Sequence, residues 1–102
     1  MNFIYSHHAK QRLYERLNRS SIKFRAKITD YKDRYQSPDH MWHLFDPNNQ
    51  LEIVGESHYG GIFVITTIID TDKQRFYERM DYQVKYKYIR NAQKRKKEKN
   101  GS

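Results

Sequence analysis

The chain has 102 residues and no cysteine, and its 20 Lys and Arg residues against 12 Asp and Glu residues give a formal net charge of +8. This length is typical of a single domain, and without cysteine the chain has no disulfides, thiolate metal sites or cysteine nucleophile. No run approaches the ~20 apolar residues of a membrane span, and the first residues lack a signal-peptide pattern. We therefore expect a soluble, cytoplasmic protein with no membrane partner.

The basic residues concentrate at both ends of the chain. Residues 1–35 carry nine basic and three acidic side chains, residues 36–82 carry three and eight, and residues 83–102 carry eight and one. Separate basic regions favour binding to a polyanion, of which nucleic acid is the most common. The alternative is a basic surface that only keeps the protein in solution.

The first third of the chain predicts a short strand and two helices. Residues 3–5 are typical of a strand, and Ser6 is a suitable N-cap for a helix over His7–Leu17. The buried stripe of this helix recurs every four residues at Ala9, Leu13 and Leu17.

A second helix is predicted over residues 21–36. It would end before Pro38, because the residue that precedes a proline is disfavoured in helical geometry. Its buried face would be formed by apolar residues at helical spacing, namely Phe24, Ile28, Tyr31 and Tyr35.

After Pro38 the pattern becomes that of strands, predicted over residues 41–45, 51–54 and 62–69. The last of these is rich in β-branched residues and is the expected central strand. Residues 72–89 fit both a helix and a strand, and we favour the helix because Thr71–Gln74 matches a capping box.

This order of elements predicts an α+β domain over residues 1–89, with two N-terminal helices packed on an antiparallel sheet of about four strands. Residues 90–102 would form a basic tail that is flexible when unbound.

The segment Tyr5–Arg16 carries a pattern seen in a known family. Tyr-Ser-x-His, with arginines four and eight residues after His8, resembles the start of the RegB-type phage endoribonucleases, and the His-Ala-x-x-Arg-x-x-Glu-Arg helix resembles a group of small uncharacterised domains. RegB belongs structurally with the RelE and YoeB toxins. The resemblance implies a RelE-like fold and metal-independent cleavage of RNA without a cofactor, with mRNA, free or on the ribosome, as the substrate.

Three residues of this helix suit that chemistry. Metal-independent cleavage of RNA needs a base for the 2′-hydroxyl, a cation for the charge that develops on phosphorus and an acid for the leaving oxygen. His8 suits proton transfer, and Arg12 and Arg16 suit phosphate binding. Because the three stand at i, i+4 and i+8, they share one helix face. The alternative to a catalytic role is a solvated face on which the arginines pair with acids such as Glu15.

Candidates for the second proton carrier lie elsewhere. RegB-type enzymes have a second functional histidine on the second helix, where this chain has Ile28. His58, in the turn before the central strand, could replace it, with Glu56 as a further base; an ordinary turn histidine is the alternative. His40 and His43 are three residues apart, but without cysteine or an HExxH pattern we expect no metal site.

The remaining basic residues suit phosphate contacts rather than chemistry, and the expected RNA-binding set is Arg19, Lys85, Lys87, Arg90, Lys94, Arg95, Lys96 and Lys97. The sequence thus favours a metal-independent endoribonuclease. A non-catalytic module of the same fold that binds RNA, the ribosome, or a host or antitoxin protein is the main alternative. A DNA-binding regulator is disfavoured, because no helix-turn-helix pattern is recognisable.

Overall fold

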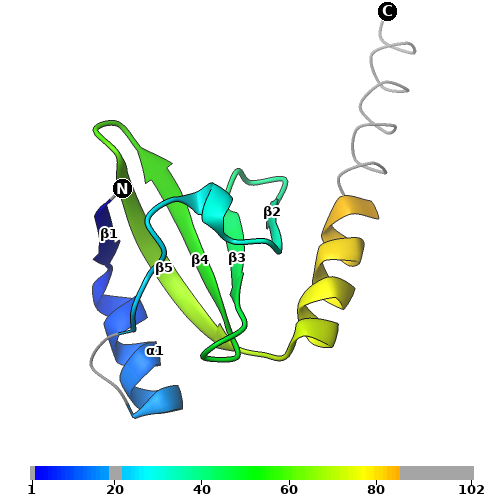
Figure 1. The fold of residues 1–102 in the computed structure, drawn as a ribbon, viewed down its shortest axis with the longest axis horizontal. Coiled ribbons are helices and arrows are strands. Elements are labelled where there is room, and N and C mark those ends of the chain that lie inside the picture. Colours follow the sequence, from blue (N-terminus) through cyan, green and yellow to red (C-terminus); the bar gives the residue numbers. More distant parts are fainter. Residues whose placement is uncertain (1, 19–21, 86–102) are drawn as a thin grey trace, which may run out of the picture.

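The computed structural model of the chain describes residues 2–18 and 22–85, which form one five-stranded sheet with a helix on each face (Figure 1). The elements in chain order are β1 (Asn2–Tyr5), α1 (His7–Leu17), the 3-10 turn η1 (Ile28–Asp30), β2 (Arg34–Gln36), β3 (Trp42–Asp46), β4 (Leu51–His58) and β5 (Ile62–Asp70), followed by a C-terminal helix over residues 73–85.

The sheet is mixed, with the strand order β1-β5-β4-β3-β2. Strands β2 to β5 form an antiparallel meander, and β1 joins its outer edge parallel to β5, with Asn2 opposite Ile62 and Tyr5 opposite Ile65. The N-terminal strand therefore pairs with the strand that is farthest from it in the described sequence.

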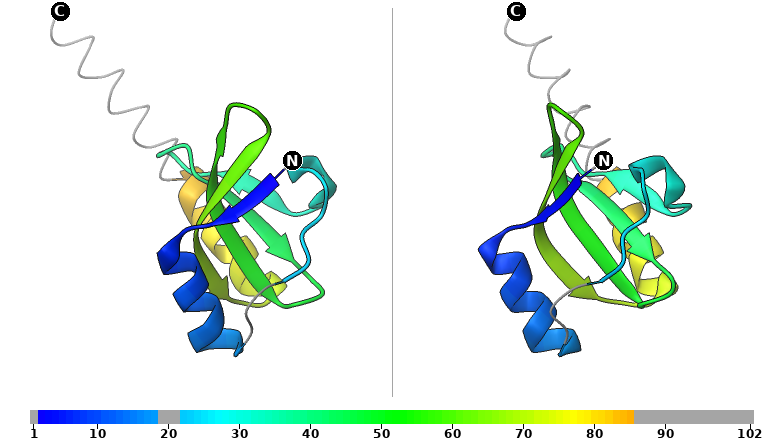
Figure 2. Two further views of the ribbon diagram at one scale, coloured as in Figure 1. Left: turned by 90° about the vertical axis from the view of Figure 1, so that its left-hand side faces the viewer. Right: turned by 60° about the vertical axis from the view of Figure 1, so that its left-hand side comes forward.

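Side chains alternate along the strands between two faces that are covered separately. On the α1 face, α1 buries Ala9 and Leu13 against residues that include Ile53 and Ile65. On the opposite face, which we call the C-helix face, Phe76 of the C-terminal helix packs against Phe45 and Tyr35. Figure 2 shows the two helices on opposite sides of the sheet.

Much of the predicted structure is confirmed. Helix α1 has the predicted bounds, and the strands expected over 3–5, 41–45, 51–54 and 62–69 are present with ends that differ by a few residues. Residues 73–85 are helical rather than extended, although the first-turn cap is Asp72, whose Oδ1 accepts a hydrogen bond of 2.8 Å from the backbone N–H of Arg75.

The prediction of two N-terminal helices on an antiparallel sheet of about four strands is wrong, and with it the RelE-like arrangement. No helix covers residues 22–36: an extended segment leads into η1 and then into β2. The reason is tertiary. Ile28 and Tyr31 lie in the core of the α1 face, whereas Tyr35 lies in the core of the C-helix face, so these residues do not share one stripe. The Asp30 carboxylate accepts the Lys27 N–H at 2.9 Å and closes a single 3-10 turn.

Gly55 marks a close approach between β4 and β5. The pairing register shifts between Val54 and Gly55, and a Cβ at Gly55 would overlap the buried ring of Phe63 and the backbone carbonyl of Val64. Only a residue without a side chain fits at this bend of the sheet.

We expect the substitution Gly55→Ala to lower the free energy of unfolding by about 3 kcal/mol, because the added methyl group displaces a packed ring and a strand carbonyl. Gly60→Ala is the control: Gly60 has a φ of +78°, and a Cβ there would have no atom within 4 Å, so it should lose only about 1 kcal/mol through backbone strain. Urea denaturation measures both, and equal losses would contradict the close approach.

Candidate functional site

The stripe predicted on α1 lies on the outer side of the helix. Ser6 caps the helix through its Oγ, which accepts the Ala9 N–H at 3.0 Å. With Ala9 and Leu13 turned into the core, His8 is exposed at the first turn. The Nε–H of Arg12 donates to His8 Nε2 at 3.3 Å, which places an imidazole beside a guanidinium at the surface.

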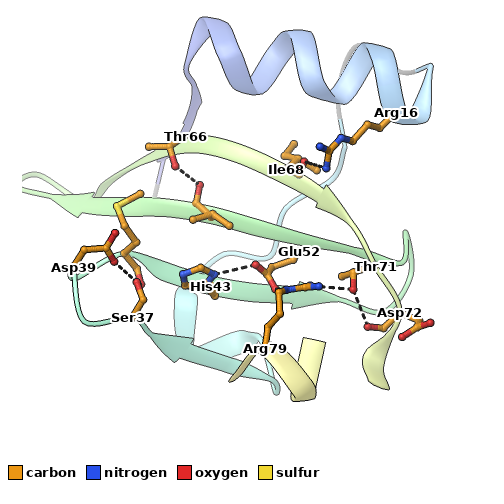
Figure 3. A network of polar contacts seen from close by, with 12 residues as sticks. Arg16, Ser37, Asp39, His43, Glu52, Thr66, Ile68, Thr71, Asp72 and Arg79 are labelled. Atoms are coloured by element: carbon orange, nitrogen blue, oxygen red, sulfur yellow. Dashed lines mark hydrogen bonds and ion pairs between the residues drawn. The ribbon is translucent and has the colours of Figure 1, made fainter. Parts of the chain in front are cut away.

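Arg16 is directed elsewhere. Its Nη1 donates to the backbone carbonyl of Ile68 at 3.1 Å (Figure 3). Strand β1 pairs with β5 only from Ile62 to Ile65, so Arg16 supplies a donor to the sheet beyond the end of β1. Of the three stripe residues, the structure joins His8 to Arg12 and ties Arg16 to the sheet.

His58 lies far from His8. It ends β4, and its Nε2 is 3.3 Å from the Glu56 carboxylate, with both side chains half exposed. Alternation along β4 places both on the C-helix face, opposite α1. His58 pairs with Ile62, which lies three residues before Ile65, the partner of Tyr5 at the end of β1 that leads into α1; this separation is about 10 Å along β5. The structure therefore brings His58 together with Glu56 and not with His8.

The C-helix face holds a buried polar cluster around Glu52 (Figure 3). The Glu52 side chain is 0% exposed, and Arg79 donates to its Oε1 from Nη2 at 2.9 Å and from Nε at 3.3 Å. The same Nη2 reaches Thr71 Oγ1 at 2.9 Å, while Glu52 Oε2 lies 2.9 Å from His43 Nδ1. The carboxylate thus links β4 to β3 and to the C-terminal helix.

His43 is held in one orientation by this cluster. Its ring stacks on Tyr35 with centroids 4.4 Å apart and planes 6° apart. Burial and the nearby Glu52 charge raise the pKa of the Tyr35 phenol far above its ordinary value, so Tyr35 remains a neutral stacking partner. In the neutral imidazole, Nδ1 donates to the Glu52 carboxylate, which can only accept, and Nε2 then carries a lone pair.

A cavity of about 400 Å³ opens beside His43, lined by residues of the 37–41 loop, of β3 and β4 and of the C-terminal helix: Ser37, Pro38, Asp39, Met41, His43, Val54 and Gln83. In the described part of the chain every buried side-chain nitrogen or oxygen has a partner. His43 Nε2 makes no hydrogen bond within the described residues. It is therefore not one of these buried atoms, and it is accessible. Figure 3 places His43 between Glu52 and the Ser37–Asp39 pair.

Asp39 makes the rim of this cavity acidic. The hydroxyl of Ser37 donates to its carboxylate, and this hydrogen bond, together with those from the backbone N–H groups of Met41 and Asp39, holds the pKa of Asp39 below its ordinary value. Asp39 is therefore ionised at neutral pH.

A basic surface lies on the opposite side, on the extended segment that leads into η1. Ile22 is buried and Phe24 is half-buried, whereas Lys23, Arg25 and Lys27 are exposed. Two tyrosine hydroxyls fix the backbone, since Tyr5 accepts the Ile22 N–H and Tyr31 accepts the Arg25 N–H, at 3.1 and 3.2 Å. Within residues 2–18 and 22–85, none of the three cations has a carboxylate within 4.0 Å.

Sequence reasoning considered His43 only as a metal ligand with His40. The structure separates the two, because His40 lies in a turn at φ 66° before β3 begins. Over the described ranges no group of three or more potential ligands could hold a metal ion. The signal for the His43 cluster was the single charged residue, Glu52, in the apolar run Leu51–Val54, because a buried carboxylate requires partners.

Most of the predicted RNA-binding set lies outside the described residues, namely Arg19, Lys87, Arg90, Lys94, Arg95, Lys96 and Lys97. Lys85 is described and is exposed on the C-terminal helix, two residues after the cavity residue Gln83.

Comparison of the chain with protein-family models, with curated proteins and with solved structures finds no match. Among the described helices, neither has the length and apolar character needed to cross a membrane.

We expect Arg79→Ala to lower the free energy of unfolding by about 3 kcal/mol, because it removes the cation that compensates a fully buried carboxylate. Arg75→Ala on the same helix is the matched control: Arg75 pairs with Asp72 at 3.9 Å and both side chains are exposed, so it should cost no more than about 0.5 kcal/mol. Denaturant unfolding measures both, and a loss for Arg79→Ala no larger than that of the control would contradict the linking role of Glu52.

Proposed function

We propose that this protein binds single-stranded RNA through phosphate contacts of its basic surface. The observation that carries the proposal is the segment 22–27, on which Lys23, Arg25 and Lys27 are exposed and the backbone is held by the core. Cations with no carboxylate within 4.0 Å retain their charge for a ligand, and a fixed backbone reduces the entropy that binding would cost.

The distribution of charge supports the same proposal. The acidic residues Asp39 and Glu56 lie on or beside the C-helix face, whereas the segment of Lys23, Arg25 and Lys27 is flanked by Ile22 and Ile28, which are buried in the core of the α1 face. A nucleic-acid backbone would therefore meet one positive side of the protein. The sequence after Lys85 is rich in Lys and Arg, and we include these residues among the proposed phosphate contacts.

RNA is favoured over DNA for two reasons. The sequence of α1 resembles that of RNA-cleaving proteins, and the two described helices lie on opposite faces of a sheet, so they do not form a helix-turn-helix unit. Such an RNA-binding protein would act in the cytoplasm, on mRNA or at the ribosome.

Replacement of Lys23, Arg25 and Lys27 together by Gln should weaken binding to a single-stranded RNA and flatten its salt dependence. Each lost phosphate contact lowers the slope of log K against log salt by about 0.7 for single strands, so the triple variant should lose about 2. Fluorescence anisotropy across a salt series measures the slope.

The control for this series is Arg75→Gln, which also removes an arginine charge but on the C-terminal helix, where Arg75 is paired with Asp72. Its slope should match that of the unaltered protein. A triple variant with an unchanged slope would refute the role of the 22–27 segment.

A second candidate function is metal-independent cleavage of the bound RNA at α1. The contact between His8 Nε2 and Arg12 Nε favours it, because it sets a proton carrier next to a phosphate-binding group. Beside this pair the structure places the Glu15 carboxylate, whose Oε2 lies 3.9 Å from Arg12 Nη1; in this scheme the leaving oxygen takes its proton from water. If no RNA is cut, the domain would be a non-catalytic module that binds RNA, the ribosome, or a host or antitoxin protein.

If α1 is catalytic, His8→Ala should reduce cleavage by on the order of 10²-fold or more, with 2′,3′-cyclic phosphate ends formed by the unaltered protein in EDTA. The neighbouring His7, exposed on the same turn, provides the control, and His7→Ala should leave cleavage unchanged. End-group analysis of labelled RNA makes the measurement. Tight binding without cyclic phosphate on free RNA and on translating ribosomes would reject cleavage.

A further inference from the structure

We infer that the cavity beside His43 receives an unpaired nucleobase that carries an exocyclic amino group. The inference rests on the proposed binding of RNA and adds recognition of a base to the phosphate contacts. The cavity is separate from the α1 stripe and from the basic segment, because it opens on the C-helix face between β3, β4 and the C-terminal helix.

The walls of the cavity suit a flat ring. Pro38, Met41 and Val54 supply apolar surface, and the volume of about 400 Å³ falls within the range of small-molecule sites. Proteins that bind single-stranded RNA commonly take splayed-out bases into such places and read their edges by hydrogen bonds.

The polar atoms at the cavity are mainly acceptors. His43 offers the lone pair of Nε2, because its Nδ1 is committed to Glu52 at 2.9 Å. Asp39 offers an ionised carboxylate, which has room for about four hydrogen bonds; the Ser37 hydroxyl and the backbone N–H groups of Met41 and Asp39 occupy part of that capacity. Gln83 can donate or accept, so it adapts to either kind of edge.

This set discriminates between ligands. Adenine, cytosine and guanine each carry an amino group that can donate to Asp39 or His43, and carboxylates are known partners of such groups. Uracil presents one N–H between two carbonyls, and a carbonyl facing the Asp39 carboxylate would be repelled. A phosphate is excluded in the same way, because none of the described residues that line the cavity is a Lys or an Arg.

The test compares four RNA 10-mers, uniform oligouridine and the same strand with a single central A, C or G. A hydrogen bond to a charged acceptor contributes about 1.5–3 kcal/mol, so each amino-bearing base should bind about tenfold more tightly than uracil. Asp39→Asn, which replaces an acceptor oxygen by a donor, should bring the four affinities to within about twofold. Asp81→Asn is the control: Asp81 is exposed on the C-terminal helix and does not line the cavity, so the ranking should persist.

A second measurement separates this inference from the proposed function. Cytidine and uridine, as free nucleosides, are titrated into the protein while the imidazole resonances of His43 are followed by NMR. A shift with cytidine and none with uridine supports the cavity even if the 10-mers fail to bind, which would reject only phosphate binding. Equal affinities for the four 10-mers, a ranking unaltered by Asp39→Asn, or equal responses to the two nucleosides would overturn the inference.

Discussion

The arrangement of the C-helix face depends on the burial of one carboxylate. Glu52 is fully enclosed, and a charge in that position is tolerated only when it is paired and hydrogen-bonded. Arg79 brings the C-terminal helix to it, and His43 brings β3. The same interaction therefore positions Phe76 over the sheet, fixes which nitrogen of His43 carries the proton and leaves the other nitrogen open to the cavity. Structure and candidate chemistry on this side follow from a single charged residue.

Local periodicity was enough to predict the elements whose neighbours are adjacent in sequence. Helix α1 follows from Ser6 and the Ala9–Leu13 spacing, and β3 to β5 follow from apolar runs separated by turns. For the segment 22–36, local periodicity gave the wrong prediction. Its apolar spacing fits a helix, but Tyr31 and Tyr35 pack on opposite faces of the sheet. Which face each residue meets is decided by strands that come later in the chain, and a local pattern does not contain that information.

The same limit applies to the candidate site. His8 and Arg12 were predicted as neighbours because an i, i+4 contact needs only a helix. The hydrogen bond from Arg16 to Ile68 joins residues 52 positions apart in the sequence. The contacts of Glu52 join it to His43, nine positions away, and to Arg79, 27 positions away. Such contacts exist only once the sheet and helix are assembled. The sequence indicated a buried acid at Glu52, but it did not indicate which residues pair with that acid.

The parallel pairing of β1 with β5 has a consequence for how the chain folds during synthesis. Residues 2–5 find their partners at residues 62–65, so the first strand of this sheet to be synthesised waits for the last one. The meander of β2 to β5 can form from local hairpins, whereas closure by β1 requires a long loop, which is slow in folding. Until then the edge of β5 is unpaired, and α1 and Arg16 cannot cover it. The N-terminal strand and helix would therefore join last, as a unit added to a preformed meander.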